Sequence, residues 1–480
     1  MAIRDPSAAL LLGLDLGTSA VKAVLLDRAG RVVAAGSGEF PTDTAADLRA
    51  EQDPADWLAA TAAACAGLAA GATDWRERVS AIGLTGQLPT LVRMGRTGPL
   101  GAAITWKDAR ADVWAAGMID ARERRALYER TGMPIDGRYL APMYLFHGAP
   151  AGETVTTLLS AKDFLCWALT GERCTDPSTA AGYGVYDLAA QAFSAVLGAP
   201  WATPAQLLPD VLPSRGLAGV LHARGAALLG LGAGTPVTVG AADSVASAYA
   251  MAGLEQGVVC VTMGSSTIIL DAVRERRLDP ATRYLLTPHV APGWFGREMD
   301  LLATGTGYRW LSELFGWRAG ELDAAAARVA PGANGLSFAP YLAGGEQGAL
   351  WDPALRGSIR GLGLHHGRDD IARAFLEGVC FEIRRCVDVL AEVAPVHRVV
   401  VAGHMAAQPA SVQLLADVLD RPVALHDSVS PAAIGAALCA ASIAGWGDVP
   451  PSPAPGAVVQ PGPAAAAYRS LYARYVDAVR

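Results

Sequence analysis

The chain begins with short apolar runs separated by turns that contain glycine. The runs occupy residues 10–14, 21–26 and 32–37, and Gly17 and Gly30 stand in the turns between them. Short apolar runs joined by such turns predict neighbouring strands. We therefore expect the chain to open with a three-stranded antiparallel meander.

A helix and a further strand are predicted directly after the meander. Asp53 can cap a helix, and Pro54 suits the first helical position. The helix is expected over residues 53–70, and an apolar run predicts a strand over residues 79–84. A meander followed by a helix and a strand predicts an α/β domain.

The opening pattern recurs in the second half of the chain. Residues 258–263 predict a strand, residues 264–266 a tight turn and residues 267–270 a second strand. Segment 14–19 matches segment 261–266 in its order of apolar, glycine and hydroxyl residues. Two such hairpins indicate two domains built on one plan, although so short a pattern also arises by chance.

Further helix and strand signals follow in the second half. Apolar side chains recur at helical spacing along residues 369–392. The other predicted elements are a strand at 399–402, a helix at 411–419, a strand at 423–425, a helix at 431–444 and, after a Pro- and Gly-rich linker at 450–463, a short terminal helix. We place a domain boundary within 236–243, so that residues 1–241 form an N-terminal domain and residues 242–480 a C-terminal domain.

Composition narrows the class of protein. Hydrophobic residues make up 52% of the 480 positions and charged residues 18%, which allows large buried cores and excludes a disordered chain. The net charge of −7, without a basic run, argues against a nucleic-acid partner. No stretch approaches the roughly 20 apolar residues of a membrane helix, so no membrane partner is expected.

The seven cysteines are scattered along the chain, and no pair has the C-x-x-C spacing of a metal or redox site. They are best interpreted as reduced structural thiols, as in proteins of a reducing compartment. A cytoplasmic enzyme is therefore expected.

The first turn of the meander has the composition of a phosphate-binding loop. A turn built around Gly17 exposes backbone N–H groups that can cradle phosphate oxygens. Thr18 and Ser19 add hydroxyl donors, Lys22 adds positive charge, and Asp15 could hold Mg²⁺ through water. The alternative is an ordinary hairpin with polar turn residues, and the segment is not a Walker A motif.

The equivalent turn in the second half has the same character. It consists of Gly264, Ser265 and Ser266. Two phosphate-type turns, one from each domain, could face each other across a cleft and hold a nucleotide from both sides.

Asp243 stands between an apolar strand at 237–239 and an Ala-rich helix, and Ser244 follows it. Small flanking residues would let a ligand approach this carboxylate closely. Phosphoryl transfer to an alcohol requires a group that accepts the hydroxyl proton, and a carboxylate can do so. On local sequence alone, however, a helix cap is the favoured role for Asp243.

A possible sugar-binding group lies between these segments. Trp106 offers an apolar ring face, Asp108 a carboxylate, and Gln87 an amide. Sugars are held by this combination of ring contact and hydrogen bonds to hydroxyls. A core tryptophan with nearby surface charges is an equally good interpretation of the residues alone.

Taken in order, these segments resemble the FGGY carbohydrate kinases of the actin/Hsp70/sugar-kinase superfamily. The resemblance rests on Leu-Gly-Leu-Asp-Leu-Gly-Thr-Ser at 12–19, Ile-Gly-Leu-Thr-Gly-Gln at 82–87, Trp-Lys-Asp-Ala-Arg at 106–110, Gly-Ala-Ala-Asp at 240–243, Gly-Ser-Ser at 264–266, Arg-Trp-Leu at 309–311, and the segments 340–346, 351–353, 356–357, 377–379 and 413–418. The ordered set covers nearly the whole chain.

The resemblance implies an α/β fold of two RNase-H-like domains flanking a central cleft that binds ATP and Mg²⁺. It implies that Asp243 is the general base and that Asp15 and Asp243 lie at the metal. The residues implied on the nucleotide side are Gly17, Thr18, Ser19, Lys22, Gly264, Ser265, Ser266, Gly305, Gly403 and His404. Those implied on the sugar side are Gln87, Leu88, Trp106, Asp108, Asp243 and Ser244.

Within the family, the chain is most similar to the xylulokinases, which implies phosphorylation of D-xylulose to D-xylulose 5-phosphate. It departs from them at Leu88-Pro89, where xylulokinases carry Met-His, and at His404, where a second Gly is usual. Another polyol or sugar acid, such as gluconate or a tetritol, therefore stays open as the substrate. A superfamily ATPase or sugar-binding regulator without kinase turnover is a further alternative. A homodimer is expected only because such assemblies are common.

Overall fold

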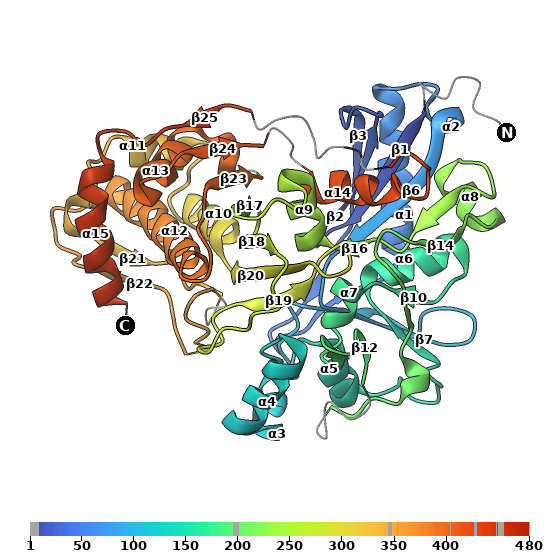
Figure 1. Cartoon of the computed structure of the whole chain (residues 1–480). Helices are drawn as coiled ribbons and strands as arrows, with labels where there is room; N and C mark the ends of the chain where they lie inside the picture. The colour runs from blue at the N-terminus through green and yellow to red at the C-terminus, as the bar shows by residue number, and fades with distance from the viewer. Residues whose placement is uncertain are drawn as a thin grey trace.

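The computed structural model describes residues 9–194, 201–343, 348–352, 354–403, 405–426, 430–447, 449 and 456–479. The chain folds into two α/β units, each built on a seven-stranded sheet (Figure 1). The predicted α/β fold of two related domains around a cleft is confirmed. The domain boundary between residues 241 and 242 stays a prediction.

The first sheet contains the predicted meander. In spatial order its strands are β14 (Leu217–Val220), β15 (Pro236–Thr238), β6 (Val79–Gly86), β1 (Leu10–Leu16), β2 (Ala20–Leu26) and β3 (Val32–Glu39), and β16 (Ala241–Ala242) also pairs with β6. Strands β1, β2 and β3 pair in antiparallel fashion. Strand β6 runs parallel to β1, and β16 runs parallel to β6. The parallel strands bring the ends of β1, β6 and β16 to one edge of the sheet.

The outer face of the first sheet is covered by α1 (Pro54–Gly67), α6 (Ala161–Thr170) and α8 (Ala223–Leu229). Helix α1 starts as predicted, because the Asp53 side chain accepts a hydrogen bond from the N–H of Ala55 and Pro54 occupies the first turn. Trp57 of α1 is fully buried against the apolar strands. Burial of this apolar face fixes the helix on the sheet.

A smaller β-rich region extends the first domain. Its five-stranded sheet has the order β4 (Asp43–Thr44), β5 (Ala50–Gln52), β8 (Ala103–Thr105), β7 (Thr90–Met94) and β9 (Thr157–Leu159). The remaining elements are η2 (Leu68–Ala70), α2 (Trp75–Arg78), α3 (Asp112–Met118), α4 (Ala121–Thr131), α5 (Leu140–His147), α7 (Pro177–Ala181), η3 (Ala205–Leu207), and the pairs β10 (Cys174–Thr175) with β13 (Asp210–Val211) and β11 (Tyr186–Asp187) with β12 (Ala192–Phe193).

The second sheet begins with the hairpin that the sequence predicted to repeat the first. Its strands, in spatial order, are β19 (Leu285–Pro288), β20 (Phe295–Leu301), β18 (Thr267–Val273), β17 (Val258–Met263), β23 (Arg398–Ala402), β24 (Val423–Leu425) and β25 (Val458–Val459). Strand β25 lies within the segment that was expected to be a linker. It pairs with β24, so this part of the expectation is wrong.

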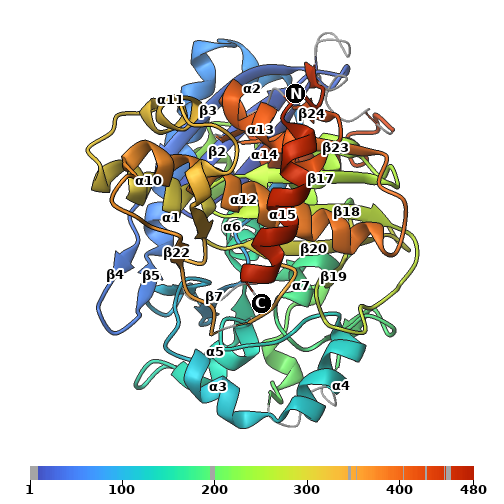
Figure 2. The ribbon, with the colours of Figure 1, turned by 90° about the vertical axis from the view of Figure 1, so that its left-hand side faces the viewer.

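Helices cover the outer face of the second sheet, and Figure 2 shows α12, α13 and α15 in front of it. The elements on this side are α10 (Thr304–Leu314), α11 (Glu321–Ala327), η4 (Ala333–Gly335), β21 (Ser337–Ala339), β22 (Ser358–Arg360), α12 (Arg368–Ala391), η5 (Met405–Ala407), α13 (Pro409–Leu419) and α15 (Ala465–Ala478). Helix α12 follows the predicted apolar stripe. The motif residues 344–346 and Pro353, and residues 450–455 of the linker, lie outside the described part of the chain.

Two helices lie between the sheets: α9 (Asp243–Ala252) and α14 (Pro431–Ala440) (Figure 1). Helix α14 comes from the second half of the chain yet packs on β1 and β6 of the first sheet. A Cβ atom at Gly13 would lie 1.9 Å from the carbonyl oxygen of Ala433, and one at Gly83 would lie 1.8 Å from that of Ala436. Glycine is therefore required at both strand positions for this close approach.

Candidate active site

A cavity of about 150 Å³ lies where the two domains meet. The first domain contributes Thr18, Leu88 and Trp106 to its wall, and the second contributes Ser266 and Ile268. The cavity is also lined by Asp243 and Ser244. The structure thus brings residues from both predicted phosphate turns and from the predicted sugar side to one place.

Asp243 is the first residue of α9 and does not cap it. The N-cap residue is Ala242, and no side chain caps this helix, so the cap interpretation favoured by local sequence is not supported. Burial raises the pKa of Asp243 to about 8, and the negative charges of Asp15 and Glu298 add to this effect. An acid–base group in a cavity is most effective when its pKa lies close to the working pH, and the raised pKa brings Asp243 into that range.

Asp15 lies near the end of β1, next to the first turn. Burial raises its pKa, and the charge of Lys22, its register partner on β2, opposes that rise. One carboxylate oxygen of Asp15, Oδ1, is buried without a hydrogen-bond partner among the described residues. A buried oxygen of this kind fits a site for a cation or its water ligands.

The donor set agrees with Mg²⁺ rather than with a metal held by protein alone. The described residues contain no group of three or more His, Cys, Asp or Glu side chains arranged to hold a metal. Mg²⁺ is usually held by one or two carboxylates together with substrate phosphates and water. Asp15 and Asp243 would provide those carboxylates.

The two predicted phosphate turns have similar hydrogen bonds. The N–H of Gly17 donates to the carbonyl oxygen of Ala20 (3.1 Å), and the N–H of Gly264 donates to that of Ser266 (2.9 Å). Helix α10 begins against the second turn, where the N–H of Thr306 donates to the carbonyl oxygen of Ser265 (3.0 Å).

The residues predicted on the adenosine side lie near this second turn. A Cβ atom at Gly305 would lie 2.1 Å from the carbonyl oxygen of Gly264, so only glycine allows α10 to begin this close. Gly403 follows β23 and lies against Met263 of β17. His404 lies outside the described residues.

The structure places some of the predicted sugar-side residues in the cavity wall and others outside it. Trp106 lines the cavity, and its Nε1–H donates to Thr18 Oγ1 (3.3 Å). Leu88 lines it too, and the Leu88–Pro89 peptide bond is cis. Gln87 and Asp108 are buried outside the lining.

Those two side chains have protein partners instead. Gln87 donates to Gln52 Oε1 (2.8 Å). Asp108 accepts from the N–H of Ala50 (3.0 Å) and forms an ion pair with Arg110 (2.6 Å). Their predicted contacts with a sugar therefore stay predictions. Their present contacts support a role in holding neighbouring protein groups in place outside the cavity lining.

Several cavity residues were missed by the sequence analysis. The most prominent are Asp136, Arg138, Glu298 and Asp300, which line the cavity beside Asp243. In the alternating segment 295–301, Glu298 and Asp300 share one face of a strand, which was the available signal. Predicting that this face meets the cleft requires the pairing of β20 with β18, which no local pattern reveals.

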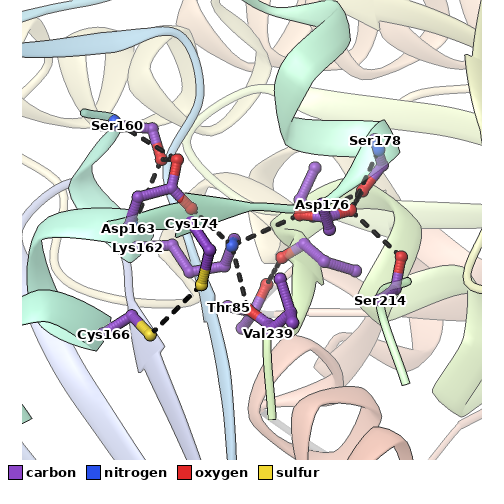
Figure 3. Close-up of polar contacts among 12 residues, drawn as sticks. Thr85, Ser160, Lys162, Asp163, Cys166, Cys174, Asp176, Ser178, Ser214 and Val239 are labelled. Atoms are coloured by element: carbon purple, nitrogen blue, oxygen red, sulfur yellow. Dashed lines mark hydrogen bonds and ion pairs between the residues drawn. The ribbon is translucent and has the colours of Figure 1, made fainter. Parts of the chain in front are cut away.

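A second buried polar group, here called the Lys162 cluster, adjoins the cavity, which one of its members, Ser178, also lines (Figure 3 shows the cluster). It consists of Lys162, Asp163, Asp176, Ser178 and Ser214. Lys162 Nζ lies 2.6 Å from Asp163 Oδ1 and 3.3 Å from Asp176 Oδ1. Burial opposes its charge, but the two carboxylates raise its pKa above the ordinary value. Asp176 Oδ2 accepts hydrogen bonds from both serine hydroxyls.

The Lys162 cluster holds the backbone that leads into Asp243. Lys162 Nζ donates to the carbonyl oxygen of Val239 (2.9 Å), and the N–H of Ala242 donates to Ser178 Oγ (2.9 Å). Between them, Thr85 Oγ1 donates to the carbonyl oxygen of Ala241 (2.7 Å). These contacts fix the segment from both ends and so fix where α9 begins.

Comparison with known proteins gives two family matches that together cover most of the chain. Residues 10–250 match the N-terminal domain of the FGGY family of carbohydrate kinases, and residues 259–444 match its C-terminal domain. No helix within the described residues is long and apolar enough to cross a membrane.

Similar curated proteins carry different substrate names. The chain is 28% identical to a xylulose kinase of Lactococcus lactis (85% of this chain, 83% of the relative). It is 27% identical to a gluconokinase of Bacillus licheniformis (89% and 86%) and 32% identical to a glycerol kinase of Gloeobacter violaceus (91% and 89%).

Among solved structures, the xylulose kinase of Rhodospirillum rubrum is 32% identical with a TM-score of 0.83, over 98% of each chain. A kinase of Brucella ovis described as a "xyloylose kinase" is 29% identical with a TM-score of 0.87, also over 98% of each chain.

Proposed function

The chain belongs to the FGGY family of carbohydrate kinases, and on this basis we propose that it phosphorylates D-xylulose with ATP and Mg²⁺, forming D-xylulose 5-phosphate. The observation that carries the proposal is Asp243, a half-buried carboxylate at the junction of the two domains that lines a cavity to which both predicted phosphate turns contribute. The xylulose kinases among the similar proteins support the choice of substrate.

Asp243 acts as the general base in this proposal. It accepts the proton of the acceptor hydroxyl as the oxygen attacks phosphorus, which increases the nucleophilicity of that oxygen. The fixed start of α9 holds the carboxylate in position, because the preceding residues are hydrogen-bonded to the Lys162 cluster. Such fixed placement of a reacting group is a major part of catalysis in phosphoryl transfer.

Residues on the nucleotide side hold the donor. Mg-ATP supplies the transferred phosphoryl group when bound. Asp15 would help to hold the Mg²⁺ ion, and the turns that contain Gly17 and Gly264 would offer backbone N–H groups and hydroxyls to the phosphates. Because the turns belong to different domains, both must approach the same phosphates, which encloses the reaction and excludes water.

Trp106 and Leu88 form the apolar part of the acceptor site. Trp106 is held by its hydrogen bond to Thr18, so sugar side and first phosphate turn are directly linked. A sugar that packs on the indole ring would place its hydroxyls toward the polar wall of the cavity.

The proposal is tested by a coupled ADP-release assay with Mg-ATP across pentuloses, hexuloses, polyols and sugar acids. We expect the highest kcat/KM with D-xylulose. Turnover with a different sugar alone would retain the kinase and overturn the choice of D-xylulose. Bound ATP without turnover on any sugar would favour the non-kinase ATPase or regulator instead.

A further inference from the structure

Strand β20 of the second domain brings two carboxylates to the acceptor side of the cavity. Glu298 and Asp300 stand two positions apart and point to the same face of the strand. Asp300 is the direct register partner of Ile268 on β18, which also lines the cavity. Directly paired residues project to the same side of a sheet, so Asp300 is directed at the cavity by the strand pairing itself.

These carboxylates have little neutralisation from the protein. Glu298 accepts a hydrogen bond from the neutral hydroxyl of Thr287 (3.3 Å). Oδ1 of Asp300 is buried and has no hydrogen-bond partner among the described residues. Burial raises the pKa of both side chains, to about 8 for Glu298 and about 7 for Asp300, and the charge of Asp243 adds to the rise at Asp300. Hydrogen bonds from Ser244 and Thr287 oppose the rise at Glu298, and the positive charge of Arg138 opposes it at Asp300, but the pKa of each side chain stays raised. A buried acceptor atom without a donor is one that a ligand hydroxyl can satisfy.

The cavity offers no unused positive charge. Of the described residues that line it, four are acidic (Asp136, Asp243, Glu298 and Asp300) and only Arg138 is basic. Arg138 already forms an ion pair with Asp136, with Nε 3.1 Å from Oδ2. A Mg²⁺ ion would offset charge at Asp15 and Asp243, but three carboxylates would still face one guanidinium.

We propose that Glu298 and Asp300 make the acceptor site selective for an uncharged polyhydroxylated substrate and against sugar acids, with Asp300 accepting a hydrogen bond from a substrate hydroxyl. The inference rests on the proposed kinase function and specifies the charge of its acceptor. A hydroxyl donates a hydrogen bond to an acidic side chain in either state of that side chain's titration. The carboxylate of a sugar acid instead adds a further negative charge beside acidic side chains in a site of low dielectric constant, which is unfavourable. The selectivity thus uses repulsion of the wrong substrate as well as attraction of the right one.

The inference distinguishes, by their charge, substrates among which the comparisons do not decide. The similar proteins include kinases named for xylulose and glycerol, which are uncharged, and for gluconate, which carries a carboxylate. Xylulose and glycerol fit the cavity by charge, and gluconate does not.

The test compares D-xylulose with D-xylonate, and D-glucitol with D-gluconate. The two members of each pair have the same number of carbon atoms, but only one of them carries a negative charge. For the wild-type protein we expect kcat/KM for the neutral member to exceed that for the acid by about 10-fold or more, as for like charges held close together. In Asp300→Asn, which keeps the shape but not the charge, we expect that ratio to fall about 5-fold, mainly through KM. Asp187→Asn, outside the cavity, should leave the ratio unchanged.

Binding is measured in parallel by the shift in unfolding temperature that each sugar produces. A shift with the neutral sugars and none with the acids supports the proposal even if turnover is absent, in which case only the kinase function fails. Equal efficiency or equal binding of neutral and acidic sugars, or binding of neither, overturns the selectivity. Glu298→Gln serves as the second variant if Asp300→Asn does not fold, and the wild-type comparison needs no variant.

Discussion

Two neighbouring groups of acidic side chains in this protein differ in how their charge is balanced. In the Lys162 cluster, one buried ammonium group lies between Asp163 and Asp176, and serine hydroxyls donate to the remaining oxygens. In the cavity, the pKa values of Asp243, Glu298 and Asp300 are raised by burial and by negative neighbours. The positive charge of Arg138 opposes the rise at Asp300, but Arg138 is also paired with Asp136.

The difference indicates what each group is for. Acidic groups that share a buried cation and accept hydrogen bonds from hydroxyls can be buried at a smaller net cost, and they then hold their surroundings in one arrangement. An acidic group whose charge is not balanced lowers the stability of the fold. Such residues cluster at sites where a ligand binds or a proton is transferred. The first group fixes the backbone before Asp243, and the second faces the place where we expect the substrate.

The comparison predicts its largest effect at Asp243. Asp243→Asn should lower kcat by about 100-fold or more, since the base is lost while the shape of the side chain is kept. ATP binding, measured by equilibrium dialysis, should persist. The matched control is Asp187→Asn, which removes a buried carboxylate on β11 that pairs with Arg130 away from the cavity. Sugar-dependent ADP release within 10-fold of wild type would remove Asp243 from the role of base.

The balanced cluster should respond in stability. Lys162→Met leaves Asp163 and Asp176 buried without their cation, and removing one partner of a buried ion pair costs roughly 3–5 kcal/mol. The measurement is urea unfolding monitored by tryptophan fluorescence. Arg31→Met is the control, because Arg31 pairs with Asp27 at the surface, where a pair contributes about 1 kcal/mol or less. Equal losses in the two variants would mean that the buried cluster is not held by Lys162.

The smallest predicted effect is a pH-dependent gain in stability. The pKa of Asp300 is raised to about 7, so between its ordinary value near 3.8 and pH 7 the folded state binds more protons than the unfolded state. The contribution of Asp300 to the free energy of unfolding therefore falls as the pH rises through that window. Asp300→Asn should raise the unfolding temperature, and the gain should be larger at pH 8 than at pH 5.

Asp187→Asn is expected to change stability in the opposite direction, as a loss rather than a gain. Burial opposes the ionisation of Asp187, but hydrogen bonds from Ala190, Arg130 and Ala189 lower its pKa below the ordinary value. Its charged form therefore stabilises the fold, and the loss in the variant should be larger at pH 8 than at low pH. A pH-independent gain in Asp300→Asn would show that Asp300 does not titrate as its surroundings imply.

Local signals predicted much of the fold. The meander, the helix that starts at Pro54, and the repeated hairpin all follow from short apolar runs, turn residues and a cap, which act within a few residues of each other. The predicted linker failed at β25, because two apolar residues become a strand only through pairing with β24. Local composition carries no information on such a distant partner.

The candidate site was predictable only in part, for the same reason. Thr18, Trp106, Asp243 and Ser266 belong to segments with distinctive composition, and all four line the cavity. Asp300 belongs to an ordinary alternating strand, so its position depends on sheet pairing and on the meeting of the two domains. The predicted residues of the site come from local motifs, and the missed ones come from tertiary structure.

The packing of α14 has a consequence for the order in which the protein can fold. The inner face of the first sheet is covered in part by a helix that ends at Ala440, and it fits there only because Gly13 and Gly83 leave room for its backbone. A ribosome makes the first sheet long before it makes that helix. During synthesis, the nascent first domain therefore exposes apolar strand surface until nearly the whole C-terminal domain has emerged, so the two halves complete their folding together.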